Sequence, residues 1–244
     1  MTGPLDGYKV IDLTTMIAGP FATMLMGDQG ADVIKVEIRG RGDHVRATAN
    51  QQGGFSASFL NNNRNKRSIT LDLKRTEGRD LLHRMAAAAD VLVQNFRPGV
   101  VERLGIAEGD VRPHAPRLIY VSMSGFGVDG PYVHKPVYDP IIQAVSGLAS
   151  VQGGGDDLRP RLVRTVVPDK VTALTASQAI TAALLVRERT GEGQHVTLNM
   201  LDAMMQFLWA TDMGGQTFVA KPFPQHRVSA FNDLIYATAD GHMA

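Results

Sequence analysis

The sequence predicts an α/β fold: a mostly parallel, Rossmann-like sheet with helices on both faces, followed by the start of a smaller second domain. Two observations lead to this prediction. Short apolar, β-branched runs alternate with helical segments along most of the chain. In addition, residues 5–37 have the pattern of one strand–turn–helix–strand unit, and such units build parallel sheets.

The strand–turn–helix–strand unit at residues 5–37 is the first repeat of the predicted alternation. We expect Pro20 at the first helical position, where a helix loses no hydrogen bond to proline, and Gly30 as a left-handed C-cap. The turn before this helix would present free backbone amides to a ligand. Its glycines do not follow GxGxxG, so no dinucleotide fingerprint is indicated. The predicted elements are strand 8–13, turn 18–20, helix 21–29 and strand 31–37.

The remaining chain continues the alternation. Residues 1–200 are expected to form a large domain, and residues 201–244 a linker helix and the incomplete start of a small one. Residues 234–244 (LIYATADGHMA) predict a strand and an Asp-Gly turn whose partner strand is missing. The further predicted elements are strands 68–73, 90–94, 118–122 and 194–198, helices 76–89, 100–104, 141–151, 169–190 and 201–211, and an extended run at 161–167.

Composition narrows the functional class. The chain has 244 residues, 44% of them hydrophobic, a formal net charge of +1 and no cysteine. The small net charge gives no general attraction for nucleic acid or an anionic membrane. The absence of cysteine suits a reducing compartment. No signal pattern or membrane-length apolar run is present. We therefore expect a cytoplasmic protein without nucleic-acid or membrane partners.

Candidate chemistry is limited by what the motifs exclude. The seven histidines are scattered without HExxH spacing, so no metal site is expected, and neither a GxSxG elbow nor a Walker loop occurs. Basic loops could hold a polyphosphate or could be ordinary charged surface. Asp169 could simply be the N-cap of helix 169–190, and the Tyr138-Asp139 pair a simple turn. The basic groups are Arg39 and Arg41, then Arg64, Lys66 and Arg67, then Arg97 and Arg103 with Lys74.

Several longer motifs point to one family. Residues 4–37 (PLDGYKVIDLTTMIAGPFATMLMGDQGADVIKVE) resemble the opening of the family III CoA-transferases, which also include the α-methylacyl-CoA racemases. The order and spacing of the later motifs match as well, so the resemblance covers essentially the entire chain. These motifs are NRNKRSITLDLKRTEG, DVLVQNFRPGVVERLG, IYVSMSGFGVDGPY, RTGEGQHVTLNMLDAMM and YATADG.

The resemblance implies that Asp169 is the catalytic aspartate and covalent nucleophile. The substrates would be an acyl-CoA and a carboxylic acid, with no permanently bound cofactor. Backbone amides at the helix end would keep Asp169 ionised. Lys74, Arg39 and Arg103 would contact phosphates, and Phe96 and Leu71 the adenine or pantetheine. The full set of implied CoA contacts is Ile17, Ala18, Arg39, Leu71, Lys74, Asn95, Phe96, Arg103 and Tyr138.

The sequence departs from the family at three places. Racemases carry a histidine immediately before the aspartate where this chain has Tyr138-Asp139, which disfavours racemase chemistry. The oxalate-using branch has Gln and Trp where Ile17 and Thr48 stand, so oxalate is a poor candidate substrate. Where the family has a small residue followed by glycine after the nucleophile, this chain has 172–173 (TA).

Length is a further departure, because the family's polypeptide continues well beyond residue 244. We therefore expect a truncated or proteolysed chain that keeps most of the CoA-binding surface and turns over weakly or not at all. The family's interlocked homodimer is expected, with the link left open. Three hypotheses stand: a CoA-transferase, a racemase of the same superfamily, and a non-catalytic CoA-binding remnant.

Overall fold

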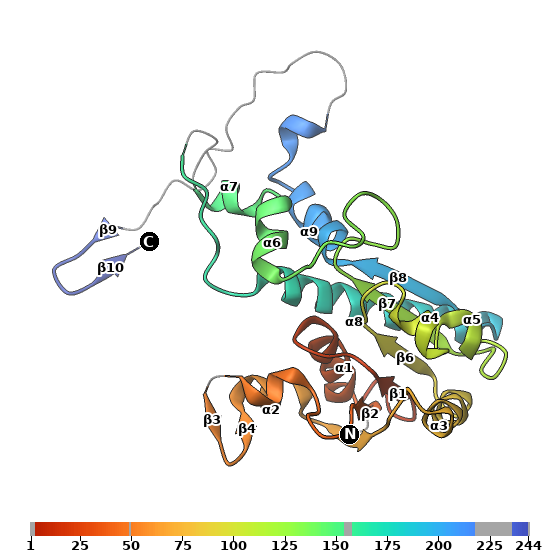
Figure 1. Cartoon of the computed structure of the whole chain (residues 1–244). Coiled ribbons are helices and arrows are strands. Elements are labelled where there is room, and N and C mark those ends of the chain that lie inside the picture. Colours follow the sequence, from red (N-terminus) through yellow and green to blue (C-terminus); the bar gives the residue numbers. More distant parts are fainter. Residues whose placement is uncertain (1–2, 49, 154–157, 218–235, 244) are drawn as a thin grey trace.

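A six-stranded sheet forms the centre of the protein, in the order β5-β2-β1-β6-β7-β8 (Figure 1). The computed structural model describes residues 3–48, 50–153, 158–217 and 236–243. Every pairing in the sheet is parallel, which confirms the predicted α/β class. The strands are β1 (Lys9–Asp12), β2 (Asp32–Glu37), β5 (Lys66–Thr70), β6 (Val91–Gln94), β7 (Ile119–Ser124) and β8 (His195–Asn199).

Helices connect the strands and cover the sheet. The predicted helix 141–151 is in fact two helices, because Gly147 between them has a positive φ of 90° and ends the first. The helices are α1 (Ala18–Asp28), α2 (Ala57–Asn63), α3 (Thr76–Ala87), α4 (Val100–Leu104), α5 (Glu108–Val111), α6 (Asp139–Val145), α7 (Leu148–Gly153), α8 (Val167–Thr190) and α9 (Met200–Trp209). The shorter elements are β3 (Gln51–Gln52), β4 (Phe55–Ser56), η1 (His44–Ala47) and η2 (Gly214–Gln216).

The core lies on both faces of the sheet. Successive strand residues point to opposite faces, so Val10 packs toward α1 and α8 while Ile11 packs toward α3, α4 and α5. In β6, Val91 and Val93 join the first cluster and Leu92 the second. The sheet is therefore buried on both sides, as parallel sheets require.

A third apolar cluster joins α6, α7, α8 and α9. Its buried members are Ile142, Leu148, Met204 and Leu208. This packing places the start of α6 beside the start of α8, which matters for the site. Among the described residues, no helix combines the length and apolar character needed to span a bilayer.

Residues 236–243 form a hairpin. β9 (Tyr236–Ala237) pairs antiparallel with β10 (His242–Met243), and the Thr238 amide donates to the Gly241 carbonyl at 2.8 Å. The predicted strand and turn are therefore present, but the expectation that the partner strand is missing is wrong. Residues 234, 235 and 244 of that prediction lie outside the described part of the chain.

Candidate functional site

The carboxyl ends of all six parallel strands lie at one edge of the sheet. Chain order reverses between β1 and β6, and ligands of open α/β sheets bind at such a point. Asn95 ties the two loops together there: its Oδ1 accepts from the Thr15 amide at 2.9 Å, and its Nδ2 donates to the Thr15 carbonyl at 2.8 Å. Both polar groups of the Asn95 side chain, an implied CoA contact, thus bind the turn after β1 at the point where chain order reverses.

The turn between β1 and α1 is tightly built. A Cβ on Gly19 would lie 2.3 Å from Cβ of Thr14, so only glycine fits. Met16 has a positive φ of 69°, a backbone conformation that side chains disfavour and that often marks functional sites. The helix begins at Ala18, so the prediction of Pro20 at the first position is wrong. Pro20 is the third helical residue, where its missing amide also costs no hydrogen bond.

Asp169 lies where the N-termini of α1 and α8 meet. The N-cap of α8 is Val166, so the reading of Asp169 as N-cap is wrong; it is the third helical residue. Its Oδ1 accepts instead from the Ala18 amide at 3.2 Å, across 151 positions of sequence. Ile17, the N-cap of α1, precedes that amide. Two of the implied CoA contacts therefore adjoin the implied nucleophile.

A second carboxylate holds the start of α8. Asp139 is buried, and its Oδ2 accepts from the backbone amide of Asp169 at 3.2 Å. Its Oδ1 accepts from Nε2 of Gln143 at 2.6 Å, and Gln143 Oε1 accepts from the Val163 amide at 2.8 Å. Tyr138, which precedes Asp139 as the N-cap of α6, is 58% exposed. Tyr138 is thus one residue from the group that contacts Asp169.

The surroundings of Asp169 favour a basic carboxylate. Burial and, to a smaller extent, the charge of Asp139 raise its pKa, the Ala18 amide lowers it, and the resulting pKa is about 6. The amide therefore acts in the predicted direction, but burial outweighs it. With this pKa, roughly nine-tenths of the carboxylate is ionised at pH 7. A desolvated carboxylate of raised basicity is a better nucleophile than one in water.

The other implied contacts lie on neighbouring loops at the same edge. Arg39 follows β2 on an exposed loop, and Leu71 and Lys74 follow β5. Phe96 follows β6 and packs on the apolar cluster beneath α3 and α4, while Arg103 is exposed at the end of α4. Within the described ranges, no hydrogen bond or ion pair joins any of these five side chains to Asp169.

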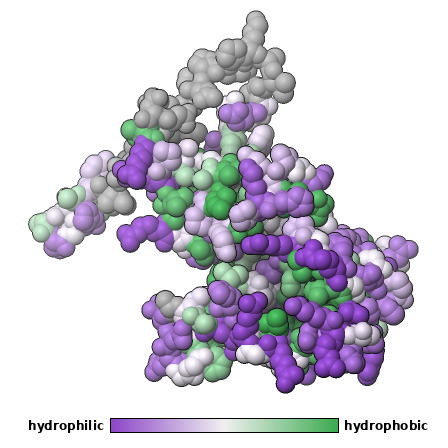
Figure 2. Space-filling model, viewed as in Figure 1, coloured by the Kyte–Doolittle hydropathy of each residue, from purple (hydrophilic) through white to green (hydrophobic). Residues whose placement is uncertain are grey.

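In the space-filling view the surface is hollowed between the part carrying α6 and the part carrying α2, with α1 between them (Figures 1 and 2).

The side chains of one of the three basic groups, Arg64, Lys66 and Arg67, form ion pairs within the chain. Lys66 Nζ is buried and donates to Asp12, to the Pro20 carbonyl at 2.8 Å and to Asn63. Arg67 pairs with Asp32, and Arg64 with Asp28. Lys66 is thus enclosed by groups of this chain, whereas Arg64 and Arg67 remain exposed, and contact of this basic group with a polyphosphate stays a prediction.

A buried charge cluster beneath the first turn was not predicted from the sequence. Lys35 Nζ lies 2.9 Å from Asp43 Oδ2 and donates to the Thr14 carbonyl at 2.8 Å. Asp12 lies 2.9 Å from Lys66 Nζ. Burial raises the pKa of Asp12, but Lys66 and Lys35 outweigh it and hold that pKa well below its usual range. The available signal was a charged residue inside each apolar run, VIDL and VIKV.

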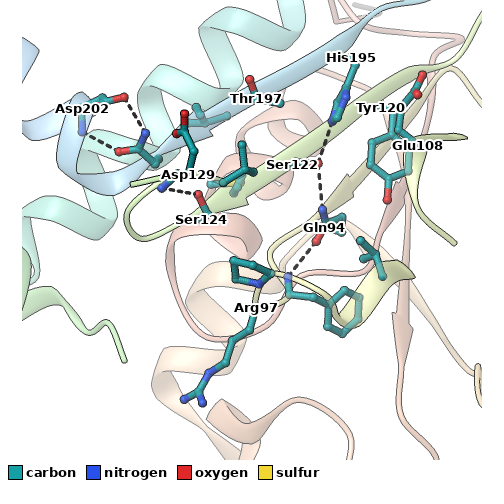
Figure 3. A pocket seen from close by; sticks show the side chains of 18 of the residues that line it. Gln94, Arg97, Glu108, Tyr120, Ser122, Ser124, Asp129, His195, Thr197 and Asp202 are labelled. Atoms are coloured by element: carbon teal, nitrogen blue, oxygen red, sulfur yellow. Dashed lines mark hydrogen bonds between the residues drawn. The ribbon is translucent and has the colours of Figure 1, made fainter. Parts of the chain in front are cut away.

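A cavity of about 410 Å³ lies over one face of the sheet, where alternate residues of β7 and β8 line it beside β6 (Figure 3). It shares Phe96 and Arg97 with the loop after β6, but Asp169 does not line it. Its polar wall includes Gln94, Ser122 and His195. Within the described residues, no three His, Asp or Glu side chains are grouped so as to hold a metal ion.

Comparison with known proteins identifies the family. Residues 5–244 match the family described as CoA-transferase family III. The chain belongs to that family. It is 43% identical over 206 residues to an acetyl-CoA:oxalate CoA-transferase of Acetobacter aceti, covering 84% of this chain and 53% of the relative. It is 37% identical over 247 residues to a succinyl-CoA:glutarate CoA-transferase of Mus musculus, covering 98% and 56%.

Solved structures of the family agree in fold. A CAIB/BAIF family protein from Brucella suis superposes with a TM-score of 0.87 at 34% identity, covering 99% of this chain and 65% of that one. Rv3272 from M. tuberculosis superposes with a TM-score of 0.81 at 34% identity, covering 88% and 60%. This family III chain spans about half the length of the curated relatives named above, 53% and 56%.

Proposed function

We propose that Asp169 is the covalent nucleophile of a CoA-transferase that exchanges CoA between an acyl-CoA and a free carboxylic acid. The observation that supports this most is the carboxylate of Asp169 at the meeting point of α1 and α8, held by the Ala18 amide, with a pKa raised to about 6. Membership of CoA-transferase family III supplies the reaction class.

The proposed reaction has four steps. Asp169 attacks the thioester carbonyl, the C–S bond breaks, and an aspartyl-acyl anhydride and CoA thiolate result. The thiolate attacks the aspartyl carbonyl, giving an aspartyl-CoA thioester and the free first acid. The carboxylate of the second acid attacks this thioester and expels CoA thiolate, leaving a new mixed anhydride. The thiolate attacks the acyl carbonyl of the second acid, forming the new acyl-CoA and restoring Asp169.

The remaining residues would bind CoA and orient it. We propose that Arg39, Lys74 and Arg103 contact its phosphates, since guanidinium and ammonium groups complement phosphate oxygens. Phe96 and Leu71 would contact the adenine or pantetheine. Ile17, Ala18, Asn95 and Tyr138 would line the path toward Asp169, where exclusion of water protects the anhydride from hydrolysis.

Short dicarboxylic acids are the proposed acceptors. The relatives' names include oxalate, glutarate and succinate as substrates or products of CoA transfer. At the two positions that distinguish the oxalate-using branch, this chain has Ile17 and Thr48. We therefore rank glutarate and succinate ahead of oxalate. Racemase chemistry is not proposed, because Tyr138 stands where it needs an imidazole.

The proposal is tested by incubating the protein with succinyl-CoA and ¹³C-labelled glutarate, oxalate or acetate in D₂O. Label entering the CoA ester supports transfer; loss of the α-proton without exchange supports a racemase; CoA binding without either supports a non-catalytic remnant. Asp169→Asn should abolish exchange. Asp80→Asn, an exposed carboxylate on α3, is the matched control and should leave it unchanged.

The assembly and organisation are also proposals. We propose a cytoplasmic homodimer and a small domain that begins near residue 201. Sedimentation at several protein concentrations tests the dimer, because a monomeric mass throughout would exclude it. Limited proteolysis that removes residues after 201 and leaves the remainder folded would support the domain division.

A further inference from the structure

A series of hydrogen bonds leads from the loop after β6 across two strands to the wall of the cavity (Figure 3). The Phe96 amide donates to Gln94 Oε1 at 2.9 Å. Gln94 Nε2 donates to Ser122 Oγ at 2.9 Å, and Ser122 Oγ lies 2.9 Å from Nε2 of His195. Gln94 ends β6, Ser122 lies within β7 and His195 begins β8. We call these three side chains the relay.

The chemistry of each group gives the relay a direction. The Gln94 carbonyl must face the Phe96 amide, because two donors cannot face each other, so its NH₂ group faces Ser122. The hydroxyl oxygen of Ser122 accepts from that NH₂, which leaves its single hydrogen available to His195. When that hydrogen is donated to Nε2, His195 is a neutral imidazole with its own hydrogen on Nδ1.

The surroundings of His195 support the neutral form. His195 is exposed, and partial desolvation of its ring lowers its pKa; Glu108 on α5 acts in the opposite direction, and Arg112 lowers the pKa further. Glu108 and Arg112 form an ion pair at 2.7 Å, so each is partly compensated by the other. The ring of Tyr120 meets the imidazole edge-on, with centroids 5.3 Å apart.

We propose that Gln94, Ser122 and His195 are positioning residues for CoA: they fix the backbone at Phe96 and thereby the Asn95–Phe96 pair. This inference rests on the proposed function, in which that pair contacts CoA. The Asn95 side chain is anchored to Thr15 and the Phe96 ring to the apolar core. The relay supplies a further anchor, on the backbone between them, from β7 and β8.

The direction of the relay is tested by ¹⁵N NMR of the histidine imidazoles, with His195→Gln identifying the signal. In the native protein at pH 7, His195 should carry its hydrogen on Nδ1. In Gln94→Glu the carboxylate can only accept, so the Ser122 hydrogen turns toward residue 94 and its oxygen accepts from His195. The tautomer should switch to Nε2–H, and the pKa of His195 should rise. A native imidazole protonated on Nε2 would overturn the assignment.

The positioning role is tested by CoA affinity, measured by calorimetry. Ser122→Ala removes the central group and should weaken CoA binding about threefold to tenfold, the worth of one hydrogen bond. Ser122→Thr keeps the hydroxyl and should restore affinity to within about twofold. Ser124→Ala is the matched control: this serine follows on the same strand, and its hydroxyl accepts from the Gly127 amide outside the relay.

The outcomes separate the two proposals. Native affinity in Ser122→Ala, equal to that of Ser124→Ala, would overturn the positioning role alone. A native protein that binds no CoA would overturn both the positioning role and the proposed function, while the imidazole tautomer would still decide the direction of the relay.

Discussion

Asp169 is a carboxylate held partly out of water beside a second carboxylate, Asp139. Such an arrangement costs folding free energy when both groups are ionised, and in return gives a basic nucleophile. The Ala18 amide compensates only part of this cost. Its contact with Asp169 was not predictable from sequence, since it joins residues 151 positions apart. The resemblance identified the residue, and the structure supplies its environment.

We predict that Asp169→Asn stabilises the protein at pH 7 while abolishing transfer. The folded pKa is about 6 and the model-compound value 3.8. The ionised group therefore destabilises the folded state fully above pH 6, and the penalty disappears as pH falls below 3.8. The free energy of unfolding should rise by about 1 to 3 kcal/mol at pH 7, less near pH 4. Denaturant unfolding at both pH values measures this; an unchanged or lowered stability at pH 7 would contradict the raised pKa.

The charge of Asp139 can be tested separately. Asp139→Asn removes the neighbouring negative charge, so the pKa of Asp169 should fall and its ionisation should persist to lower pH. It should also lower stability by about 1 to 3 kcal/mol, because Gln143 and the Asp169 backbone donate to different oxygens of Asp139, and in asparagine one of these oxygens is replaced by an NH₂ donor. A ¹³C NMR titration of the Asp169 carboxyl measures the shift. An unmoved titration midpoint would show that the charge of Asp139 does not contribute to the raised pKa.

The first βα turn is supported from below by buried charges. Lys66, at the start of β5, reaches Asp12, at the end of β1, and also the Pro20 carbonyl in α1. Sequence patterns predicted both strands, although only β1 is buried, and β5 is a largely exposed edge strand. They did not predict that a lysine in a basic run, NKR, turns inward, because that depends on strand order, which puts β2 between β5 and β1.

We predict that Lys66→Met destabilises the protein by about 3 to 5 kcal/mol, because it leaves the buried Asp12 carboxylate short of a partner. Arg67→Met is the matched control: its ion pair with Asp32 is exposed, so the loss should be at most about 1 kcal/mol. Thermal or denaturant unfolding of both variants gives the comparison. Similar losses in the two variants would contradict the supporting role of Lys66.

In the described part of the molecule, the first βα turn, the loop after β6 and the starts of α6 and α8 lie together at the carboxyl edge of the sheet. Periodicity predicted the six sheet strands and most helices, because their packing follows from local apolar patterns. It missed the division at Gly147 and the start of the first helix at Ala18, which depend on backbone conformation. The candidate site required a family resemblance, since Asp169, Asp139 and Ala18 come together only in the folded chain.

The most direct measurement is chemical trapping of the proposed intermediate. The protein is incubated with succinyl-CoA and an acceptor acid, treated with hydroxylamine, digested, and its peptides are identified by mass spectrometry. Attack of hydroxylamine on an aspartyl thioester or anhydride leaves a hydroxamate on the aspartate. We predict a hydroxamate at Asp169, dependent on succinyl-CoA and absent from Asp169→Asn. Transfer of CoA that proceeds without any modification of Asp169, or that persists in Asp169→Asn, would contradict its role as the acyl-accepting carboxylate.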